Sequence, residues 1–221
     1  PVPRELDLQQ HGFELIHPQI GYTHVYPDGR SLSVHRDIEQ SCASIARFSS
    51  RDAQTYRDRC ARFAAQAEEF AGAINSPPQS PAQQLTMQAA MPGGLDEYRF
   101  ALQSMRAWAQ DGFESEHSRA LVGTWCAHVG LSPDDVGGAG VAWSFATVIQ
   151  QFGNNVVKGG MRQLPLALAG YLKAHGGEIL TDARVAKIRV ERDKAVAVQL
   201  ADGTSIDVGG LVVSGVDPQQ L

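Results

Sequence analysis

Apolar and polar positions alternate with two different periods, which divide the chain into a helical middle and a strand-rich end. Short extended runs at 22–26 and 31–35 flank the turn residues Pro-Asp-Gly-Arg at 27–30, which predicts a β-hairpin. From about residue 37 to 152, apolar residues recur at every third or fourth position, the period of amphipathic helices. This spacing predicts an all-helical block in the middle of the chain.

Capping residues and prolines set the expected helix boundaries in the first half of this block. Asp37 precedes a helix expected at about 38–48, and Ser49 precedes one whose apolar stripe runs from Tyr56 to Ile74. Three prolines fall within 75–81, and proline cannot continue a helix because it lacks the N–H and clashes with the preceding turn. We therefore expect a loop there.

Three more helices are expected in the second half of the block. One carries a stripe from Leu95 to Trp108, and the next carries Leu121 and Trp125 on one face. The third should begin at Ser132, with Pro133 at its first helical position.

From Val156 onward the pattern changes to short strands and glycine-rich turns. A strand at 156–158 leads through the tight Gly-Gly passage at 159–160 into a helix that ends at the glycines of 176–177. Three alternating runs within 186–208 predict an antiparallel β-meander. The continuous apolar run at 211–214 is typical of a strand buried on both faces.

Composition and charge exclude several classes of protein. With 221 residues and 43% hydrophobic content the chain can bury a real core. A net charge of -5 without runs of Lys or Arg predicts neither a nucleic-acid partner nor an anionic membrane surface.

The three cysteines form no CxxC pair, which favours a reducing, cytoplasmic location. The longest apolar stretches, such as 164–172, are too short to span a bilayer, and no signal peptide is expected.

Few residues offer chemistry of their own. The Gly-Ala-Gly at 138–140 lacks the third glycine of a dinucleotide fingerprint and follows a capped helix start, so we interpret it as a helix kink or as close helix packing. The histidines are too dispersed to form a metal site, and His128 is interpreted as a core residue and not a base. The tryptophans at helical spacing are interpreted as core residues, with a pocket for an apolar ligand as the alternative: Trp108, Trp125 and Trp143.

Several short motifs follow one another in a fixed order along the chain. They are Gly-Phe-Glu-Leu-Ile at 12–16, Ile-Ala-Arg-Phe-Ser at 45–49, Val-Lys-Gly-Gly-Met-Arg-Gln-Leu-Pro-Leu-Ala-Leu at 157–168, His-Gly-Gly-Glu-Ile at 175–179, Ala-Arg-Val-Ala-Lys-Ile at 183–188, Leu-Ala-Asp-Gly at 200–203 and Leu-Val-Val-Ser-Gly-Val-Asp-Pro at 211–218. In order and spacing they resemble the phytoene desaturase-like FAD oxidoreductases. The resemblance covers nearly the whole chain and is closest after Val157.

The resemblance implies an α/β fold, which in this fragment becomes α+β. Residues 1–153 would be a segment of the substrate domain, with short strands to about residue 36 followed by a helical block. Residues 154–221 would be a segment of a glutathione reductase-type FAD-binding domain, with the strand-glycine-helix unit, a three-stranded β-meander and the buried strand.

The resemblance also implies which residues contact FAD. In such proteins the Gly-Gly passage returns the chain toward the flavin, and the valine that opens the meander meets the adenine end through its backbone. By position, the residues implied to contact the cofactor are Gly159, Gly160, Met161, Leu164 and Val185. Glycine suits this role because a backbone that approaches a cofactor closely leaves no room for a Cβ. Two glycines that merely turn a strand into a helix are the alternative, and Arg162 stands where the family commonly has glycine.

Three expectations follow from the resemblance. We expect Gly160 to serve cofactor contact more than folding, so that alanine there changes stability by less than about 1 kcal/mol. Family members begin with a strand, a GxGxxG turn and a helix that hold the pyrophosphate. None of these precedes Pro1, so we expect an internal piece that does not retain FAD. Residues 211–214 would leave unpaired strand edges that favour self-association.

The leading functional hypothesis is therefore part of an FAD-dependent oxidoreductase that acts on an apolar small molecule. Flavin would take a hydride from a carbon-carbon or carbon-nitrogen bond, and no catalytic acid or base can be named. A flavin amine oxidase or protoporphyrinogen oxidase relative is one alternative. A non-catalytic helical binding module derived from such an enzyme is the other.

Overall fold

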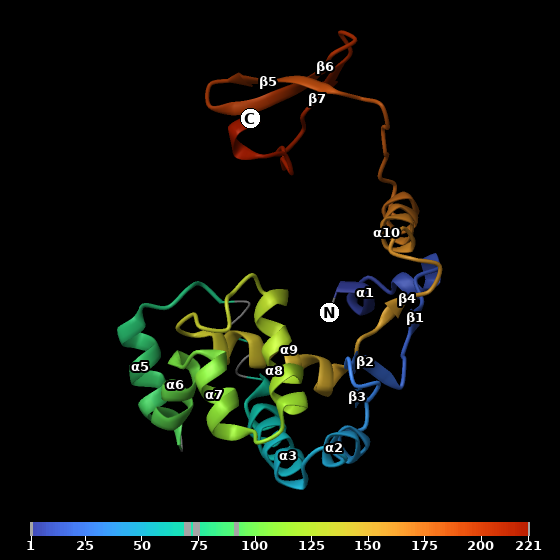
Figure 1. Ribbon diagram of the computed structural model, residues 1–221. Helices are drawn as coiled ribbons and strands as arrows, with labels where there is room; N and C mark the ends of the chain where they lie inside the picture. Colours follow the sequence, from blue (N-terminus) through green and yellow to red (C-terminus); the bar gives the residue numbers. More distant parts are fainter. Residues whose placement is uncertain (1, 69–71, 73–75, 91–92, 221) are drawn as a thin grey trace. The chain divides into compact units, whose positions relative to one another are not determined.

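The chain divides into two compact units, one of residues 14–161 and one of residues 1–13 together with 162–221. The computed structural model describes residues 2–68, 72, 76–90 and 93–220 (Figure 1). Helices and small antiparallel sheets make up both units, which confirms the expected α+β architecture. The assignment of 1–153 to a substrate domain and of 154–221 to an FAD-binding domain stays a prediction.

Two antiparallel strand pairs belong to the unit of residues 14–161. β2 (Ile20–Val25) pairs with β3 (Ser31–His35), and the Pro-Asp-Gly-Arg turn between them confirms the predicted hairpin. β1 (Leu15–Ile16) pairs with β4 (Val156–Val157), in the register Leu15 to Val157 and Ile16 to Val156. This second pair brings the two ends of the unit together.

Helices fill the chain between these strands, as predicted. Their bounds are α2 (Ile38–Ala46), α3 (Ser50–Ala65), α5 (Pro81–Ala90), α6 (Gly94–Leu102), α7 (Met105–Gly112), α8 (Glu116–His128) and α9 (Gly138–Phe152). The predicted caps are confirmed, since the Asp37 side chain accepts from the N–H of Glu39 and the Ser49 hydroxyl accepts from the N–H of Asp52.

One hydrophobic core joins the hairpin to the helices. It extends from Leu32 on β3 to Ala146 on α9, and it contains the three tryptophans, which confirms that they are core residues. α9 crosses α6 so closely that a Cβ on Gly140 would lie 2.8 Å from the Cα of Ala101. The predicted role of the 138–140 glycines in close helix packing is therefore confirmed.

The predicted helix boundaries are wrong at three places. α3 is interrupted at Gln66, whose N–H donates to the carbonyl of Phe63. The predicted helix to Ile74 is therefore not continuous. Phe70 and Ile74 themselves lie outside the described residues. The stripe from Leu95 to Trp108 is split into α6 and α7, because the Ser104 hydroxyl accepts from the N–H of Ala107 and starts a new helix.

The third boundary error concerns residues 132–137. Ser132 does not cap a helix; its N–H bonds to the Asp135 carboxylate at 2.8 Å in a tight turn. α9 begins only at Gly138, after Gly137 with a φ of 86°. An unpredicted helix, α5, begins at Pro81, the last residue of the expected loop.

The unit of residues 1–13 and 162–221 contains α1 (Val2–Glu5), η1 (Leu8–His11), α10 (Gln163–Ala174), β5 (Val185–Glu191), β6 (Lys194–Leu200), β7 (Ser205–Asp207) and η2 (Pro218–Gln220). The strands form a three-stranded antiparallel sheet in sequence order, which confirms the predicted meander. The predicted strand at 211–214 is wrong: the segment is irregular, and the side chains of Leu211 and Val213 are exposed. Among the described residues no strand lies beside it to take up its backbone hydrogen bonds.

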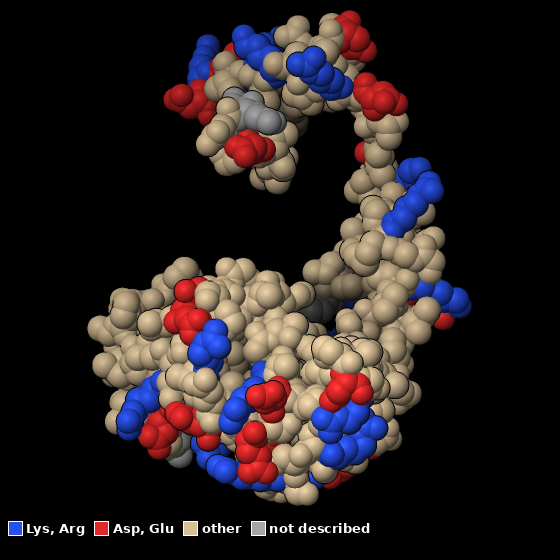
Figure 2. Space-filling view, in the orientation of Figure 1, with Lys and Arg blue, Asp and Glu red and all other residues tan. Residues whose placement is uncertain are grey.

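Charged side chains of both signs are interspersed over the helical unit, on the face drawn in Figure 2, and form no field of one sign. No helix in the described part of the chain is long and apolar enough to cross a membrane.

Candidate functional site

The Gly-Gly passage is a tight turn at the end of β4. The N–H of Gly160 donates to the carbonyl of Val157 at 3.0 Å, and Gly159 and Gly160 have φ values of 78° and 88°. A turn with positive φ at its third residue requires glycine there, as in a type II turn. Both glycines thus have a conformational reason to be present.

The β1–β4 pair anchors this turn. The Lys158 N–H donates to the Glu14 carbonyl at 2.9 Å, and the Lys158 ammonium pairs with the Glu14 carboxylate at 2.7 Å. One residue before β4, the Asn155 Oδ1 lies 2.6 Å from the His17 Nδ1. Both side-chain contacts are exposed to solvent, so their role is to orient the turn more than to add folding stability.

The space beside Gly160 is open. A Cβ on Gly160 would meet no atom within 4 Å, so the backbone here faces an open surface without a side chain of its own. The expectation that alanine at Gly160 costs little folding stability is wrong, because a φ of 88° is unfavourable for any residue with a Cβ. Gly160 thus has a conformational reason to be present, and cofactor contact there stays a prediction.

The residues implied to contact FAD fall in both compact units. Gly159, Gly160 and Met161 are consecutive in the unit of residues 14–161, and the Met161 side chain is exposed. Leu164 is half-buried near the start of α10, and Val185 is the first residue of β5, paired with Leu200; both belong to the other unit. Cofactor contact by these five residues stays a prediction.

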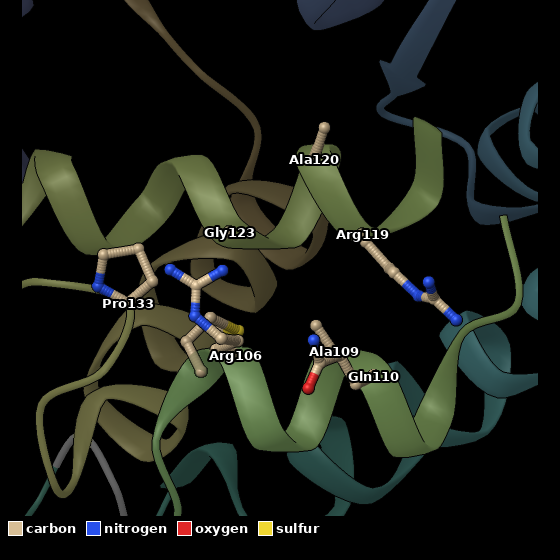
Figure 3. A pocket seen from close by; sticks show the side chains of 8 residues that line it. Arg106, Ala109, Gln110, Arg119, Ala120, Gly123 and Pro133 are labelled. Atoms are coloured by element: carbon tan, nitrogen blue, oxygen red, sulfur yellow. The ribbon is translucent and has the colours of Figure 1, made fainter. Parts of the chain in front are cut away.

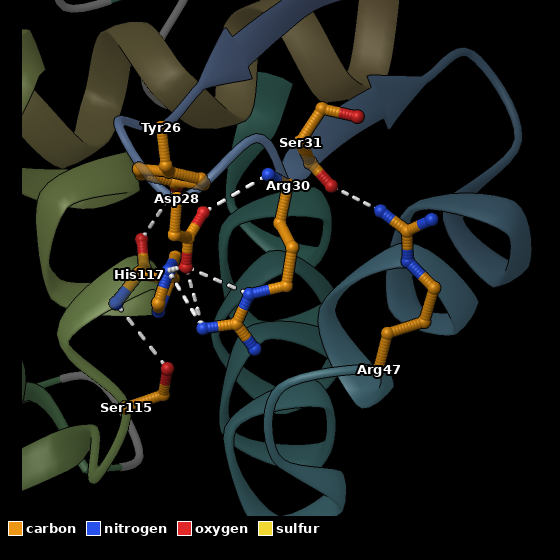
Figure 4. Close-up of polar contacts among 7 residues, drawn as sticks. All are labelled: Tyr26, Asp28, Arg30, Ser31, Arg47, Ser115 and His117. Carbon is orange, nitrogen blue, oxygen red and sulfur yellow. Dashed lines mark hydrogen bonds and ion pairs between the residues drawn. The ribbon is translucent and has the colours of Figure 1, made fainter.

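A polar cluster that the sequence did not reveal links the β2–β3 turn to the start of α8 (Figure 4). The Asp28 carboxylate accepts from the backbone N–H and the Nε of Arg30 at 2.9 and 2.8 Å and contacts the His117 Nε2 at 2.9 Å. The Tyr26 hydroxyl donates to the His117 carbonyl at 2.8 Å, and the Phe48 ring stacks on the His117 ring.

The charges and hydrogen bonds of this cluster hold the β2–β3 turn against the start of α8. The hydrogen bonds from Arg30 hold the pKa of Asp28 well below its ordinary range, so the carboxylate is charged. Burial, with a smaller contribution from the Asp28 charge, raises the pKa of Tyr26 to about 12, so the phenol is neutral. The polar atoms of the cluster bond mainly to one another, and this leaves no general base free to act on a ligand.

An open groove lies between α7 and α8 and has a volume of about 240 Å³ (Figure 3). Small side chains, Ala109 and Ala120 with Gly123, form part of its lining, and Arg106 and Arg119 lie toward opposite ends. Arg106 is already paired with Asp134 at 2.6 Å, and the Nε of Arg119 donates to a backbone carbonyl. The groove presents no reactive group.

Other candidate residues from the sequence have structural positions. His128 is exposed at the end of α8, with its ring against Trp125 and Phe145, so the interpretation as a core residue is wrong. The spacing of apolar residues predicted that His128 lies on the apolar side of its helix. α8 ends at this residue, however, and its ring lies at the surface. Within 2–68, 72, 76–90 and 93–220, no group of three or more His, Cys, Asp or Glu side chains could hold a metal ion.

Sequence reasoning missed the Glu14–Lys158 and His17–Asn155 contacts because each joins residues more than 100 positions apart. Their strand partners, β1 and β4, have two residues each, too few for a periodic signal. The one available signal was Lys158 itself, a charged residue directly before two glycines.

Comparison with known proteins identifies a family and two relatives of this chain. Residues 3–221 match the family described as flavin containing amine oxidoreductase. The chain is 28% identical to the hydroxyneurosporene desaturase of Cereibacter sphaeroides over 211 residues, covering 90% of this chain and 39% of that protein. It is 26% identical to one of the subunits of limonene dehydrogenase from Castellaniella defragrans, covering 99% of this chain and 41% of that protein. The chain thus spans about two fifths of the length of these relatives, and it belongs to the flavin containing amine oxidoreductase family.

Proposed function

We propose that this chain contributes to an FAD-dependent oxidoreductase of the desaturase type, which dehydrogenates an apolar small molecule. The observation that carries the proposal is the positive-φ turn of Gly159 and Gly160, with open space beside Gly160, at the position where the family resemblance implies flavin contact. The two relatives are named for hydroxyneurosporene and limonene, both apolar molecules, which supports an apolar substrate.

The residues proposed to contact the cofactor are Gly159, Gly160, Met161, Leu164 and Val185. FAD held there would supply the two-electron acceptor for such a dehydrogenation. The residues of this chain would position and shield the reacting bond. The Glu14–Lys158 pair and the β1–β4 hydrogen bonds keep the turn in place.

Flavin occupancy of matched glycine variants tests this proposal in the protein expressed from its complete reading frame. Gly160→Ala is compared with Gly176→Ala, because Gly176 follows α10 with a φ of 79° and, like Gly160, has no atom within 4 Å of an added Cβ. Both variants should lose similar folding stability, about 1–2 kcal/mol for a left-handed residue. Only Gly160→Ala should lose flavin, measured by visible absorbance after gel filtration.

Two results would contradict the proposal. A wild-type protein that carries no flavin after reconstitution favours the non-catalytic binding module instead. Equal flavin occupancy in Gly160→Ala and Gly176→Ala means that the glycines only turn the chain, and the assigned contact is then wrong.

A further inference from the structure

Three aromatic side chains from three helices form a continuous row of rings in the core of the unit of residues 14–161. The ring of Trp143 on α9 lies 5.0 Å from that of Trp108 on α7 and 5.5 Å from that of Tyr56 on α3, measured between centroids. Aromatic rings at such separations are in direct contact. Trp143 therefore connects the other two, and we call these three residues the aromatic chain.

The aromatic chain runs from the interior toward the surface. The exposed fraction is 1% for Tyr56, 3% for Trp143 and 8% for Trp108. At the inner end the Tyr56 hydroxyl donates to the Gln150 Oε1 at 3.1 Å, and burial raises the pKa of this phenol well above its ordinary value. An amide oxygen is a very weak base, so this contact gives the Tyr56 proton no strong acceptor.

The two indoles of the aromatic chain differ in what surrounds their N–H groups. The Nε1 of Trp143 is buried and has no hydrogen-bond acceptor among the described residues. The Nε1 of Trp108 lies beside the part-exposed Gly112, where an added Cβ would be 3.9 Å away. Because glycine has no side chain to cover this edge of the ring, the N–H of Trp108 is the one nearer to water.

These surroundings decide where a one-electron oxidation of the core comes to rest. A tryptophan that loses an electron becomes a radical cation with an acidic N–H, and a tyrosine is oxidised readily only when its proton can leave. Trp143 and Tyr56 have no strong acceptor for their protons, so an electron lost there is replaced from the neighbouring ring. Trp108 can release its proton to water, and this release keeps the oxidation on Trp108.

We infer that the aromatic chain passes single electrons from Trp108 inward to an oxidised Trp143 or Tyr56, and so removes oxidising equivalents from the core. This activity goes beyond the proposed function and does not depend on flavin binding. The oxidant is an organic peroxyl radical, the species that an unsaturated apolar molecule forms with oxygen. Its apolar body suits the apolar interior in which the aromatic chain lies.

The electrons and protons of this process balance. The peroxyl radical takes one electron from Trp143 and one proton from water, and it becomes a hydroperoxide. One electron then passes from Trp108 to Trp143, which restores the Trp143 indole and leaves the radical cation on Trp108. Trp108 releases its Nε1 proton to water and becomes a neutral radical. A thiol in solution then gives a hydrogen atom to Trp108, which restores the indole and leaves a thiyl radical in solution.

Ultraviolet photoionisation tests the inference in the protein from its complete reading frame. The light pulse removes an electron from buried and exposed tryptophans alike, hexacyanoferrate(III) captures the electrons, and transient absorbance distinguishes the radical cation from the neutral radical. Trp108→Phe should prolong the radical-cation signal at least tenfold, because phenylalanine does not give up an electron and Trp143 then keeps its charge.

Trp125→Phe is the matched control. Trp125 is 9% exposed, and its ring contacts those of Tyr22 and His128, outside the aromatic chain. This variant should lower the amplitude of the signal and leave the lifetime of the radical cation unchanged. Tryptophans elsewhere in the protein contribute equally to both variants.

A second measurement needs no variant and decides the question if Trp108→Phe does not fold. After repeated pulses without thiol, peptide mapping of the wild-type protein should find at least threefold more oxidation at Trp108 than at Trp125, although the two side chains are similarly exposed. Equal oxidation at these two residues, or equal radical-cation lifetimes in Trp108→Phe and Trp125→Phe, overturns the inference. Neither result depends on flavin occupancy, so the proposed function stands or falls separately.

Discussion

The two compact units have similar secondary structure but place their apolar side chains differently. In residues 14–161 one core cluster buries side chains from β3 and from most of the described helices. In the other unit, the buried apolar residues are few: Leu8, Phe13, Ala167, Ala197 and Leu200. Many large apolar side chains there are exposed instead, among them Leu166, Leu168, Leu172, Ile179, Leu180, Val190, Leu211 and Val213.

This difference determines what a substitution can do in each unit. Burial stabilises a fold by about 25 cal/mol per Å² of apolar surface removed from water, so truncating a core side chain is costly. The stability of α10 and the meander depends more on backbone hydrogen bonds and turn geometry than on a core. Their exposed leucines and valines add little folding stability, because they remain in contact with water. The largest effects are therefore expected in residues 14–161.

Trp143→Ala should give the largest loss of stability. Trp143 is 3% exposed, and its ring contacts those of Trp108 and Tyr56 at 5.0 and 5.5 Å between centroids. Truncation of a buried tryptophan costs about 3–5 kcal/mol. Leu166→Ala on α10 should cost about 1 kcal/mol at most, because that side chain is 48% exposed. Equal losses in urea unfolding would contradict the contrast between the units.

Asp52→Asn should have the next largest effect. The Asp52 carboxylate is fully buried and accepts from the N–H groups of Glu114 and Ser115 at 2.9 and 3.0 Å, at the start of α8. An amide keeps one acceptor and turns an NH₂ group toward the other donor, at a cost of about 3 kcal/mol. The control is Asp58→Asn on the exposed side of the same helix, which should stay within about 0.5 kcal/mol of wild type. If both variants lose the same folding stability, the loss comes from the changed charge of α3 and not from the buried hydrogen bonds of Asp52.

Gly140→Ala should destabilise the same unit by about 2 kcal/mol, since the added Cβ would lie 2.8 Å from the Ala101 Cα and the α6 backbone would have to move. Gly123→Ala on α8 meets no atom within 4 Å and should instead gain about 0.5–1 kcal/mol from its higher helix propensity. A gain from both substitutions in thermal unfolding would show that α9 and α6 are not in close contact.

The sequence predicted well those features that depend on local pattern. The hairpin, the Asp37 and Ser49 caps and the meander were all readable from turn residues and periodicity. α5 was missed although its signal was present: Ser80 and Gln83 form a reciprocal capping box directly before and within the helix, and Pro81 suits a first helical position. No helix was predicted here because the prolines within 75–81 indicated a loop.

The candidate site was harder to predict because it depends on distant contacts and on exposure. The family resemblance identified the Gly159–Gly160 turn, but the partners that hold it, Glu14 and His17, come from the other end of the unit. Exposed apolar residues of α9 such as Phe145 follow helical spacing as clearly as its buried ones, and periodicity alone cannot tell which apolar face the core covers. His128 was misplaced for another reason: α8 ends at this residue and leaves the ring at the surface.

The smallest effect is expected in the meander, where turn geometry and not a core sets the stability. The β5–β6 turn has two central residues, Arg192 and Asp193, with φ values of 51° and 61°. A two-residue hairpin turn with both φ values positive is of the type that prefers Asn-Gly, since longer side chains are unfavourable in the left-handed region. Arg192→Asn combined with Asp193→Gly should therefore stabilise the hairpin by about 1 kcal/mol. Amide hydrogen exchange should slow along β5 and β6 and stay unchanged at Trp143 in α9, because the two regions belong to different units. Faster exchange at Val190 and Ala195 would show that the native side chains support the turn through contacts of their own.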